Sequence, residues 1–153
     1  MDLYMSESVQ LEKDILRSAL ACTTDISSLK ELMHLATDRS SSFVRSQDAD
    51  TVFTAVSTNP VGQEIIFNYL LEHWDEIYNA LSSRHAAVGR IIAASSVGIR
   101  SQHQIEQLKD LKKNGKHAKE FGAFDEAIEN AEAKVDWLKK NFRKLTEYFA
   151  KSV

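Results

Sequence analysis

Apolar residues recur every three or four positions through almost the whole sequence, and few segments alternate between apolar and polar residues. The 153 residues include one proline and five glycines. A spacing of three to four is the period of an amphipathic helix, and so few helix-breaking residues leave long uninterrupted helices. The sequence therefore predicts an all-α fold, with about eight helices for a chain of this length.

The clearest helix start lies at Asn59 and Pro60. An asparagine side chain accepts a hydrogen bond from a free backbone N–H at a helix start, and proline suits the first helical position. The apolar stripe that follows predicts one helix over 60–81, with Trp74 on its buried side. Residues 46–56 carry an apolar set of their own, and the short link predicts that the two segments fold back as an antiparallel pair.

The other apolar stripes group into similar pairs. Residues 8–21 and a helix capped by Thr24 or Asp25 form the first pair, and residues 88–97 with a helix opened by Ser101 form the third. Residues 114–122 read as an exposed loop, and the stripe over 124–149 predicts either one helix or two that divide near 140–141. Successive helix pairs of about forty residues predict a HEAT- or armadillo-like solenoid forming a single domain over 1–153. The same periodicity also fits a compact multi-helix bundle.

Charge and composition argue against several classes of partner. Nineteen basic residues against 22 acidic ones give a net charge of −3, too weak a field to gather nucleic acid. No apolar run approaches the ~20 residues of a membrane span, and residues 1–10 lack the features of a signal peptide. We therefore expect no nucleic-acid or membrane contact from this segment.

The single cysteine, Cys22, cannot form an internal disulfide and is expected to be an inert core residue.

The sequence contains no recognisable catalytic or metal-binding motif. A zinc hydrolase needs two histidines four positions apart with a glutamate between them, and the five histidines here are scattered. The glycine-rich loops of nucleotide-binding proteins and the GxSxG nucleophile elbow are also missing. We predict no catalytic residue, no metal ligand and no cofactor in this chain.

Two features allow both a structural and a functional interpretation. Arg45 and the following Ser46-Gln47-Asp48 can form a helix N-cap with an anchoring arginine, or Arg45 can present its guanidinium to a peptide carboxylate. The first interpretation is favoured, because first turns of helices often have this composition. Trp74 and Trp137 can stack on ligands, but both lie on or beside apolar stripes, where core packing is the usual role.

Several segments, taken in order, are similar to one protein family. They are Leu3-Tyr4, residues 12–14 leading to 20–25, Arg45-Ser46-Gln47-Asp48, Asn59-Pro60-Val61-Gly62 followed by Phe67, Leu70, Trp74 and Asp75, and finally Val135, Trp137, Leu138 and Asn141. Their order and spacing resemble the C-terminal helical domain of M1-type zinc aminopeptidases. This group includes aminopeptidase N, the endoplasmic reticulum aminopeptidases and the puromycin-sensitive enzyme.

The resemblance implies a bowl of paired helices that closes the chamber over the active site and binds or restricts the peptide. It implies that zinc and all catalytic residues belong to another domain of the parent enzyme, which removes N-terminal amino acids from peptides. The implied partners are that catalytic domain, the peptide and a second copy in a homodimer. The structural motif residues are Gln47, Asp48, Asn59, Pro60, Gly62, Trp74 and Trp137, and Arg45 is the candidate peptide contact. Family members are membrane-anchored extracellular, endoplasmic reticulum or cytoplasmic enzymes.

A second hypothesis comes from a different functional class. A free-standing helical-repeat scaffold, binding a protein through its concave face, also fits the paired-helix pattern.

Overall fold

A computed structural model describes residues 1–151 of the chain, and within them it holds nine α-helices, one short 3-10 helix and no strand. The all-α prediction is therefore confirmed. The elements are α1 (Asp2–Ser6), α2 (Gln10–Leu20), α3 (Ile26–Thr37), α4 (Ala49–Thr58), α5 (Pro60–Glu72), α6 (Trp74–Leu81), α7 (His85–Ser96), α8 (Gln102–Asn114), η1 (Ala118–Glu120) and α9 (Ala123–Ala150).

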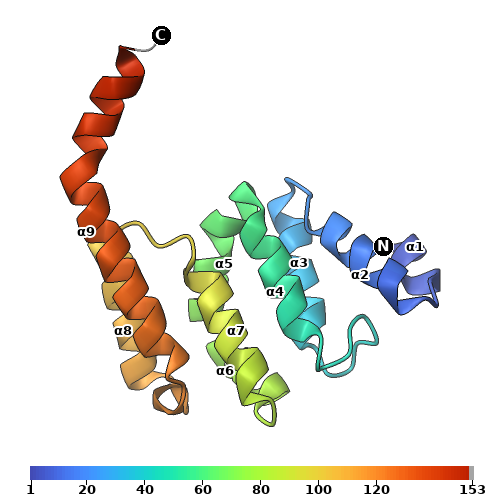
Figure 1. Cartoon of the computed structure of the whole chain (residues 1–153). Coiled ribbons are helices and arrows are strands. Elements are labelled where there is room, and N and C mark those ends of the chain that lie inside the picture. Colours follow the sequence, from blue (N-terminus) through green and yellow to red (C-terminus); the bar gives the residue numbers. More distant parts are fainter. Residues whose placement is uncertain (152–153) are drawn as a thin grey trace.

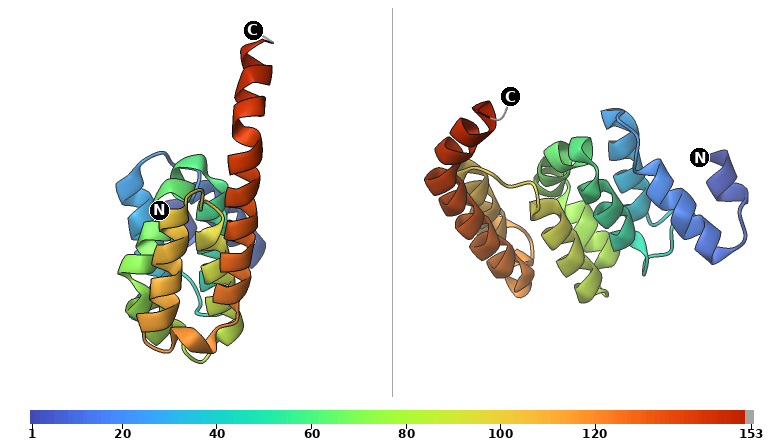
Figure 2. Two further views of the ribbon diagram at one scale, coloured as in Figure 1. Left: turned by 90° about the vertical axis from the view of Figure 1, so that its left-hand side faces the viewer. Right: turned by 45° about the horizontal axis from the view of Figure 1, so that its top comes forward.

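The helices stand side by side in one row of two layers, with the two ends of the chain at opposite ends of the row (Figures 1 and 2). One layer contains α4, α7 and α9, and the other contains α3, α5, α6 and α8. Packing follows this order, since α3 contacts α4, α4 contacts α7, and α7 contacts α9. The repeat character of the expected solenoid stays a prediction. No helix among residues 1–151 is both long and apolar enough to cross a membrane.

One continuous apolar core runs between the two layers from α3 to the first half of α9. Phe53, Phe67, Ile91 and Phe124 are among its largest fully buried side chains. Burial of a large apolar side chain stabilises a fold by about 1.5–3 kcal/mol. The core therefore joins the helices from α3 to α9, and it reaches α1 and α2 only through Tyr4, Ala21 and a few half-buried side chains.

The helix predicted over 60–81 is divided at His73, so that prediction was wrong at this point. His73 has φ −117° and ψ 20° and serves both as the C-cap of α5 and as the N-cap of α6. Its imidazole stacks on Tyr69 with ring centroids 4.3 Å apart, and its Nδ1 lies 3.0 Å from Glu76 Oε2. The apolar spacing continues across this kink, which is why periodicity alone did not reveal it.

The first predicted helix exists as α2, but its expected buried face was partly wrong. Val9, Leu11 and Ile15 are more than half exposed, whereas Arg17 is buried. Cys22, expected in the core, is also exposed. The reason is the position of α2 at the end of the row, where a neighbouring helix covers only one side of it.

The expected loop over 114–122 is partly structured. The turn η1 lies within it, Ala118 and Phe121 are buried, and the carbonyl of Lys116 accepts a hydrogen bond from the Trp74 indole at 2.9 Å.

After this connection, α9 is a single helix, which resolves the alternative between one helix and two. Trp137 on α9 is 53% exposed, so the expectation of core packing was wrong for this residue.

The junction of α4 and α5 ties two helix pairs together. Asn59 Oδ1 accepts a hydrogen bond from Val61 N at 3.0 Å, as predicted for the N-cap of α5. Asn59 Nδ2 donates to the carbonyls of Ala21 and Thr23, at 2.7 and 2.8 Å. A single side chain therefore caps one helix and fixes the end of another, α2.

We expect Asn59→Ala to lower the free energy of unfolding by about 2 kcal/mol, because both the cap and the two bonds to α2 are lost. Asn59→Ser keeps a good cap and should lose about half as much. Urea denaturation followed by circular dichroism measures both variants. Equal losses in the two variants would show that the cap contributes nothing here.

Candidate functional site

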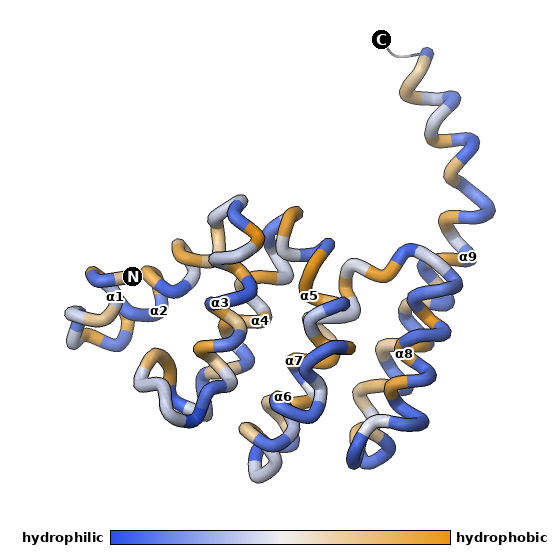
Figure 3. The backbone as a smooth tube through the Cα atoms, turned by 180° about the vertical axis from the view of Figure 1, so that it is seen from behind, coloured by the Kyte–Doolittle hydropathy of each residue, from blue (hydrophilic) through white to orange (hydrophobic). Residues whose placement is uncertain are grey.

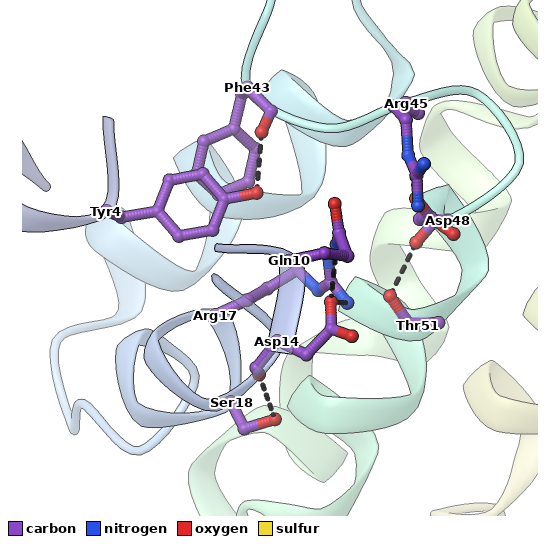
Figure 4. Close-up of polar contacts among 9 residues, drawn as sticks. All are labelled: Tyr4, Gln10, Asp14, Arg17, Ser18, Phe43, Arg45, Asp48 and Thr51. Carbon is purple, nitrogen blue, oxygen red and sulfur yellow. Dashed lines mark hydrogen bonds and ion pairs between the residues drawn. The ribbon is translucent and has the colours of Figure 1, made fainter. Parts of the chain in front are cut away.

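A small cleft lies between α2 and the loop that leads into α4 (Figure 4). Its volume is about 130 Å³, and its polar lining includes Gln10, Lys13, Arg17, Arg45 and Asp48. The loop is the serine-rich turn after α3, in which Ser40 N and Oγ both bond to the Asp38 carboxylate. The candidate residue Arg45 therefore belongs to a structured cleft.

Arg45 is held in place by Asp48. Its Nε donates to Asp48 Oδ2 at 2.6 Å, while its side chain stays 58% exposed. Asp48 stands at the N-cap position of α4 but makes no side-chain bond to the helix backbone. Its carbonyl instead accepts from Thr51 Oγ1 at 2.5 Å. The carboxylate thus orients the guanidinium and does not cap α4, so the favoured interpretation of Ser46-Gln47-Asp48 as a side-chain N-cap was wrong for Asp48.

The opposite wall of the cleft carries two more cations from one face of α2. Arg17 is 5% exposed, and its Nη2 donates to Asp14 Oδ1 at 2.7 Å. Gln10 donates to the same oxygen at 2.8 Å. The hydrogen bond from Gln10, together with the nearby charges of Arg17 and Arg45, lowers the pKa of the Asp14 carboxyl. Asp14 is therefore held in its ionised form.

Tyr4 closes one end of the cleft and attaches α1 to the loop. Its hydroxyl donates to the Phe43 carbonyl at 2.7 Å, and the two rings lie 4.7 Å apart (Figure 4). Lys13 Nζ lies 5.5 Å from the centre of the Tyr4 ring, within the range of a cation–π contact. The position of Lys13 at the cleft is thus fixed by an aromatic ring.

This arrangement suits the binding of an anion. Three cations, Lys13, Arg17 and Arg45, face two carboxylates, Asp14 and Asp48, so the lining is net positive. Guanidinium groups match the planar geometry of a carboxylate. Among residues 1–151, no three His, Cys, Asp or Glu side chains gather in a way that could hold a metal ion.

The predicted motif residues do not form one site. Asp48 lines the cleft, and Gln47 is exposed close to it in the sequence. Asn59, Pro60 and Gly62 lie at the α4–α5 junction. Trp74 is buried against Phe121 and Phe124, whereas Trp137 is exposed on α9. Sequence reasoning did not identify Lys13 and Arg17 as members of a site. Their spacing of four places them on one helix face, a signal that could have found them.

An ion pair outside the cleft joins a buried carboxylate on α4 to an exposed guanidinium on α7. Asp50 on α4 is 4% exposed, and its Oδ2 accepts a hydrogen bond from Arg90 Nε on α7 at 2.5 Å. A carboxylate buried in this way would be costly without a cationic partner. The pair therefore fixes how α7 sits against α4, and it offers no cleft to a ligand.

Comparison with known proteins relates this fold to enzymes. A family model described as the ERAP1-like C-terminal domain matches residues 1–133. The chain belongs to this family. It is 51% identical, over 99% of its length, to an aminopeptidase N of Haemonchus contortus. It is also 25% identical to an aminopeptidase N of Canis lupus familiaris over 95% of its length, and 24% identical to that of Homo sapiens over 92%.

These relatives are much longer than the chain itself. The chain spans 16% of the Haemonchus enzyme and 15% of the dog and human enzymes. The family match and the identities to aminopeptidase N confirm the resemblance to M1 aminopeptidases seen in the sequence. This ERAP1-like C-terminal domain is of the kind found in aminopeptidase N-like M1 enzymes, and its cleft is to be interpreted as part of such a domain.

Proposed function

We propose that this chain is the non-catalytic, peptide-enclosing C-terminal domain of an M1 zinc aminopeptidase. In the parent enzyme it closes the chamber over the active site and helps to bind or restrict the peptide. Zinc and the catalytic residues are supplied by the catalytic domain of that enzyme, which removes N-terminal amino acids. The observation that supports a role toward peptides is the net positive cleft, in which Asp48 orients the guanidinium of Arg45.

The cleft suits a carboxylate better than a neutral group, since Lys13, Arg17 and Arg45 all line it. A peptide that is cut from its N-terminus keeps a free carboxylate at its other end. Arg45 is the most exposed of the two arginines and can reach such a group without breaking the fold. Arg17 is buried and donates to Asp14, so we assign it the role of holding the Asp14 carboxylate beside the cleft.

We expect Arg45→Ala in the parent aminopeptidase to lower kcat/KM about 5- to 30-fold for peptides with a free C-terminal carboxylate. This loss corresponds to about 1–2 kcal/mol, near the lower end of the range for a hydrogen bond to a charged group, because the Arg45 side chain is 58% exposed. The same peptides carrying a C-terminal amide should be cleaved about equally by both enzymes. Arg84→Ala, at another exposed arginine, is the matched control. An unchanged preference for the free acid in Arg45→Ala, with the fold intact, would remove Arg45 from the site.

The apolar side chains exposed on and beside α1 and α2 support a contact with the rest of the parent enzyme. They are Met1, Leu3, Met5, Val9, Leu11 and Ile15. Terminal repeats of free-standing helical-repeat proteins need a polar outer face for solubility. Exposed apolar side chains in these two helices favour a domain that packs against other parts of a larger enzyme over a free-standing scaffold.

One measurement tests whether this chain is non-catalytic, and another separates the two hypotheses. The isolated chain should release no amino acid from a fluorogenic aminoacyl substrate, and zinc-dependent turnover by this chain would overturn the proposal. A genomic reading frame that continues upstream into an HExxH segment would support the proposed parent enzyme. A frame without such a segment would favour the scaffold.

A further inference from the structure

Three consecutive serines in the loop after α3 have different environments. The Ser40 hydroxyl donates to the Asp38 carboxylate and lies 2.8 and 3.0 Å from its two oxygens. The Ser41 hydroxyl accepts a hydrogen bond from the Phe43 backbone N–H at 3.1 Å. The Ser42 side chain lines the cleft, and within the described part of the chain its hydroxyl takes part in no hydrogen bond. Two of the three hydroxyls therefore build the turn, and the third is free.

The position of Ser42 is fixed by its neighbours. On one side the Ser41 hydroxyl holds the Phe43 N–H, and on the other the Phe43 carbonyl accepts from the Tyr4 hydroxyl at 2.7 Å. Most of the connection between α3 and α4 is hydrophilic (Figure 3), and Ser42 is exposed to solvent within it. A free hydroxyl on an exposed, irregular segment is accessible to a modifying enzyme.

The cleft presents positive charge to Ser42. Lys13, Arg17 and Arg45 line it together with one carboxylate, that of Asp48. Arg45 bonds this carboxylate through Nε, which leaves the N–H groups on its two Nη atoms for a ligand. A phosphoryl group on a serine carries close to two negative charges and three strong acceptor oxygens, and arginines opposite it stabilise it. The cleft volume of about 130 Å³ exceeds that of three waters in the liquid, about 90 Å³, so three oxygens fit.

We propose that Ser42 is a phosphorylation site and that its phosphoryl group docks into the cleft against Lys13 and Arg45. In the transfer, Ser42 Oγ bonds to the γ-phosphorus of a nucleoside triphosphate, the bond from that phosphorus to the bridging oxygen breaks, and the nucleoside diphosphate leaves. The hydroxyl proton passes to the carboxylate base of a protein kinase. The docked group occupies the place proposed for the peptide carboxylate, so phosphorylation should remove that contact. This consequence rests on the proposed function, whereas docking itself does not.

The sequence around Ser42 supports this assignment. Arg39 stands three positions before Ser42, and no other serine of the sequence has an arginine at that distance. Protein kinases choose substrates partly by charge pattern, and one class selects an arginine three positions before the serine. The Arg39 guanidinium is exposed, where it donates to the Ala80 carbonyl at 3.0 and 3.2 Å. Thr146 also follows an arginine by three positions, but it lies within α9 and its hydroxyl donates to a helix carbonyl.

Phosphoserine introduced at position 42 during synthesis of the chain tests docking without a kinase. It should raise the midpoint of thermal unfolding by about 2–5 °C, because one or two charge-assisted hydrogen bonds form. Phosphoserine at position 40 is the matched control, since it lies beside the Asp38 carboxylate and should lower the midpoint by a similar amount. An unchanged or lowered midpoint for position 42 would overturn the inference.

Phosphorus NMR tests the contact directly. The second pKa of phosphoserine is usually about 6. At position 42 the cations of the cleft outnumber its carboxylates, so this pKa should fall by about half a pH unit or more. Arg45→Ala should return the pKa to about 6 or above, whereas Arg84→Ala, at an exposed arginine elsewhere, should leave it low. A phosphoserine at position 42 that titrates near 6 in the otherwise unchanged chain would show that the group stays in solvent, contrary to the inference.

Transfer from ATP by a kinase of the arginine-directed class tests the site itself. Mass spectrometry of the treated chain should place the phosphoryl group on Ser42, and Ser42→Ala should abolish it, whereas Ser41→Ala should not. Arg39→Ala should slow incorporation about tenfold. No incorporation, or incorporation on Ser40, Ser41 or Thr146 instead, would remove Ser42 as the site.

Peptide cleavage separates this inference from the proposed function. In the parent aminopeptidase, phosphoserine at position 42 should lower kcat/KM for free-acid peptides about as much as Arg45→Ala does, and should leave peptide amides unaffected. If the phosphoryl group docks by the thermal and NMR criteria but the free-acid preference persists, the inference stands and the proposed peptide contact fails. If it does not dock and Arg45→Ala still lowers cleavage of free acids, the inference fails and the proposed function stands.

Discussion

Trp74→Ala is expected to destabilise the domain by about 3–5 kcal/mol. The Trp74 side chain is 3% exposed, lies edge-on to Phe121 and Phe124, and donates from its indole to the Lys116 carbonyl at 2.9 Å. Truncation would leave a cavity and an unpaired carbonyl between α6 and the 115–122 connection. Urea denaturation followed by circular dichroism measures the loss.

Trp137→Ala provides the control for this experiment. The Trp137 side chain is 53% exposed, so its removal should change the free energy of unfolding by less than about 1 kcal/mol. Trp74→Phe retains an aromatic ring but loses the hydrogen bond, and should fall between the two. An equal loss in the free energy of unfolding for Trp74→Ala and Trp137→Ala would contradict the prediction that burial of Trp74 stabilises the domain.

Gly62→Ala should lower the free energy of unfolding by about 2–4 kcal/mol, even though alanine normally favours a helix. A Cβ at Gly62 would lie 2.1 Å from the Val56 carbonyl oxygen and 2.9 Å from Val56 Cγ1. The last turn of α4 and the first turn of α5 would have to move apart. The two helices are joined through Asn59 alone, so this movement would strain the whole central pair.

Gly89→Ala is the matched substitution in another helix. Gly89 lies within α7, and the nearest heavy atom to an added Cβ is Ala123 Cβ at 3.6 Å, an ordinary contact. We expect this variant to be stabilised by up to about 1 kcal/mol, because the backbone entropy of glycine is lost. Opposite signs for the two substitutions are therefore the predicted result, and destabilisation of both would contradict it.

The candidate site was only partly predictable from the sequence. Arg45 and Asp48 are three positions apart, and their ion pair is a local feature that the sequence suggests. The cleft also needs Lys13 and Arg17, which come from a helix about thirty residues earlier. Their approach to Arg45 depends on the packing of α2 against α4, and no pattern within either segment records that packing.

The sequence by itself determined the helical class, the family and several helix starts. Asp25, Asn59 and Ser101 accept the capping hydrogen bonds of α3, α5 and α8. A cap needs only a side chain and backbone N–H groups two or three residues away. Amphipathic spacing is equally local, so both can be inferred without a fold.

The tertiary structure alone decided which apolar residues are covered. One continuous stripe on α9 contains both buried Val135 and exposed Phe142, and the outer residues of α2 are exposed despite their helical spacing. The break between α5 and α6 at His73 was likewise visible only in the folded chain, because the apolar spacing continues across it. Periodicity shows that a helix has an apolar face, but burial requires another element opposite that face. The position of that element is a property of the folded chain.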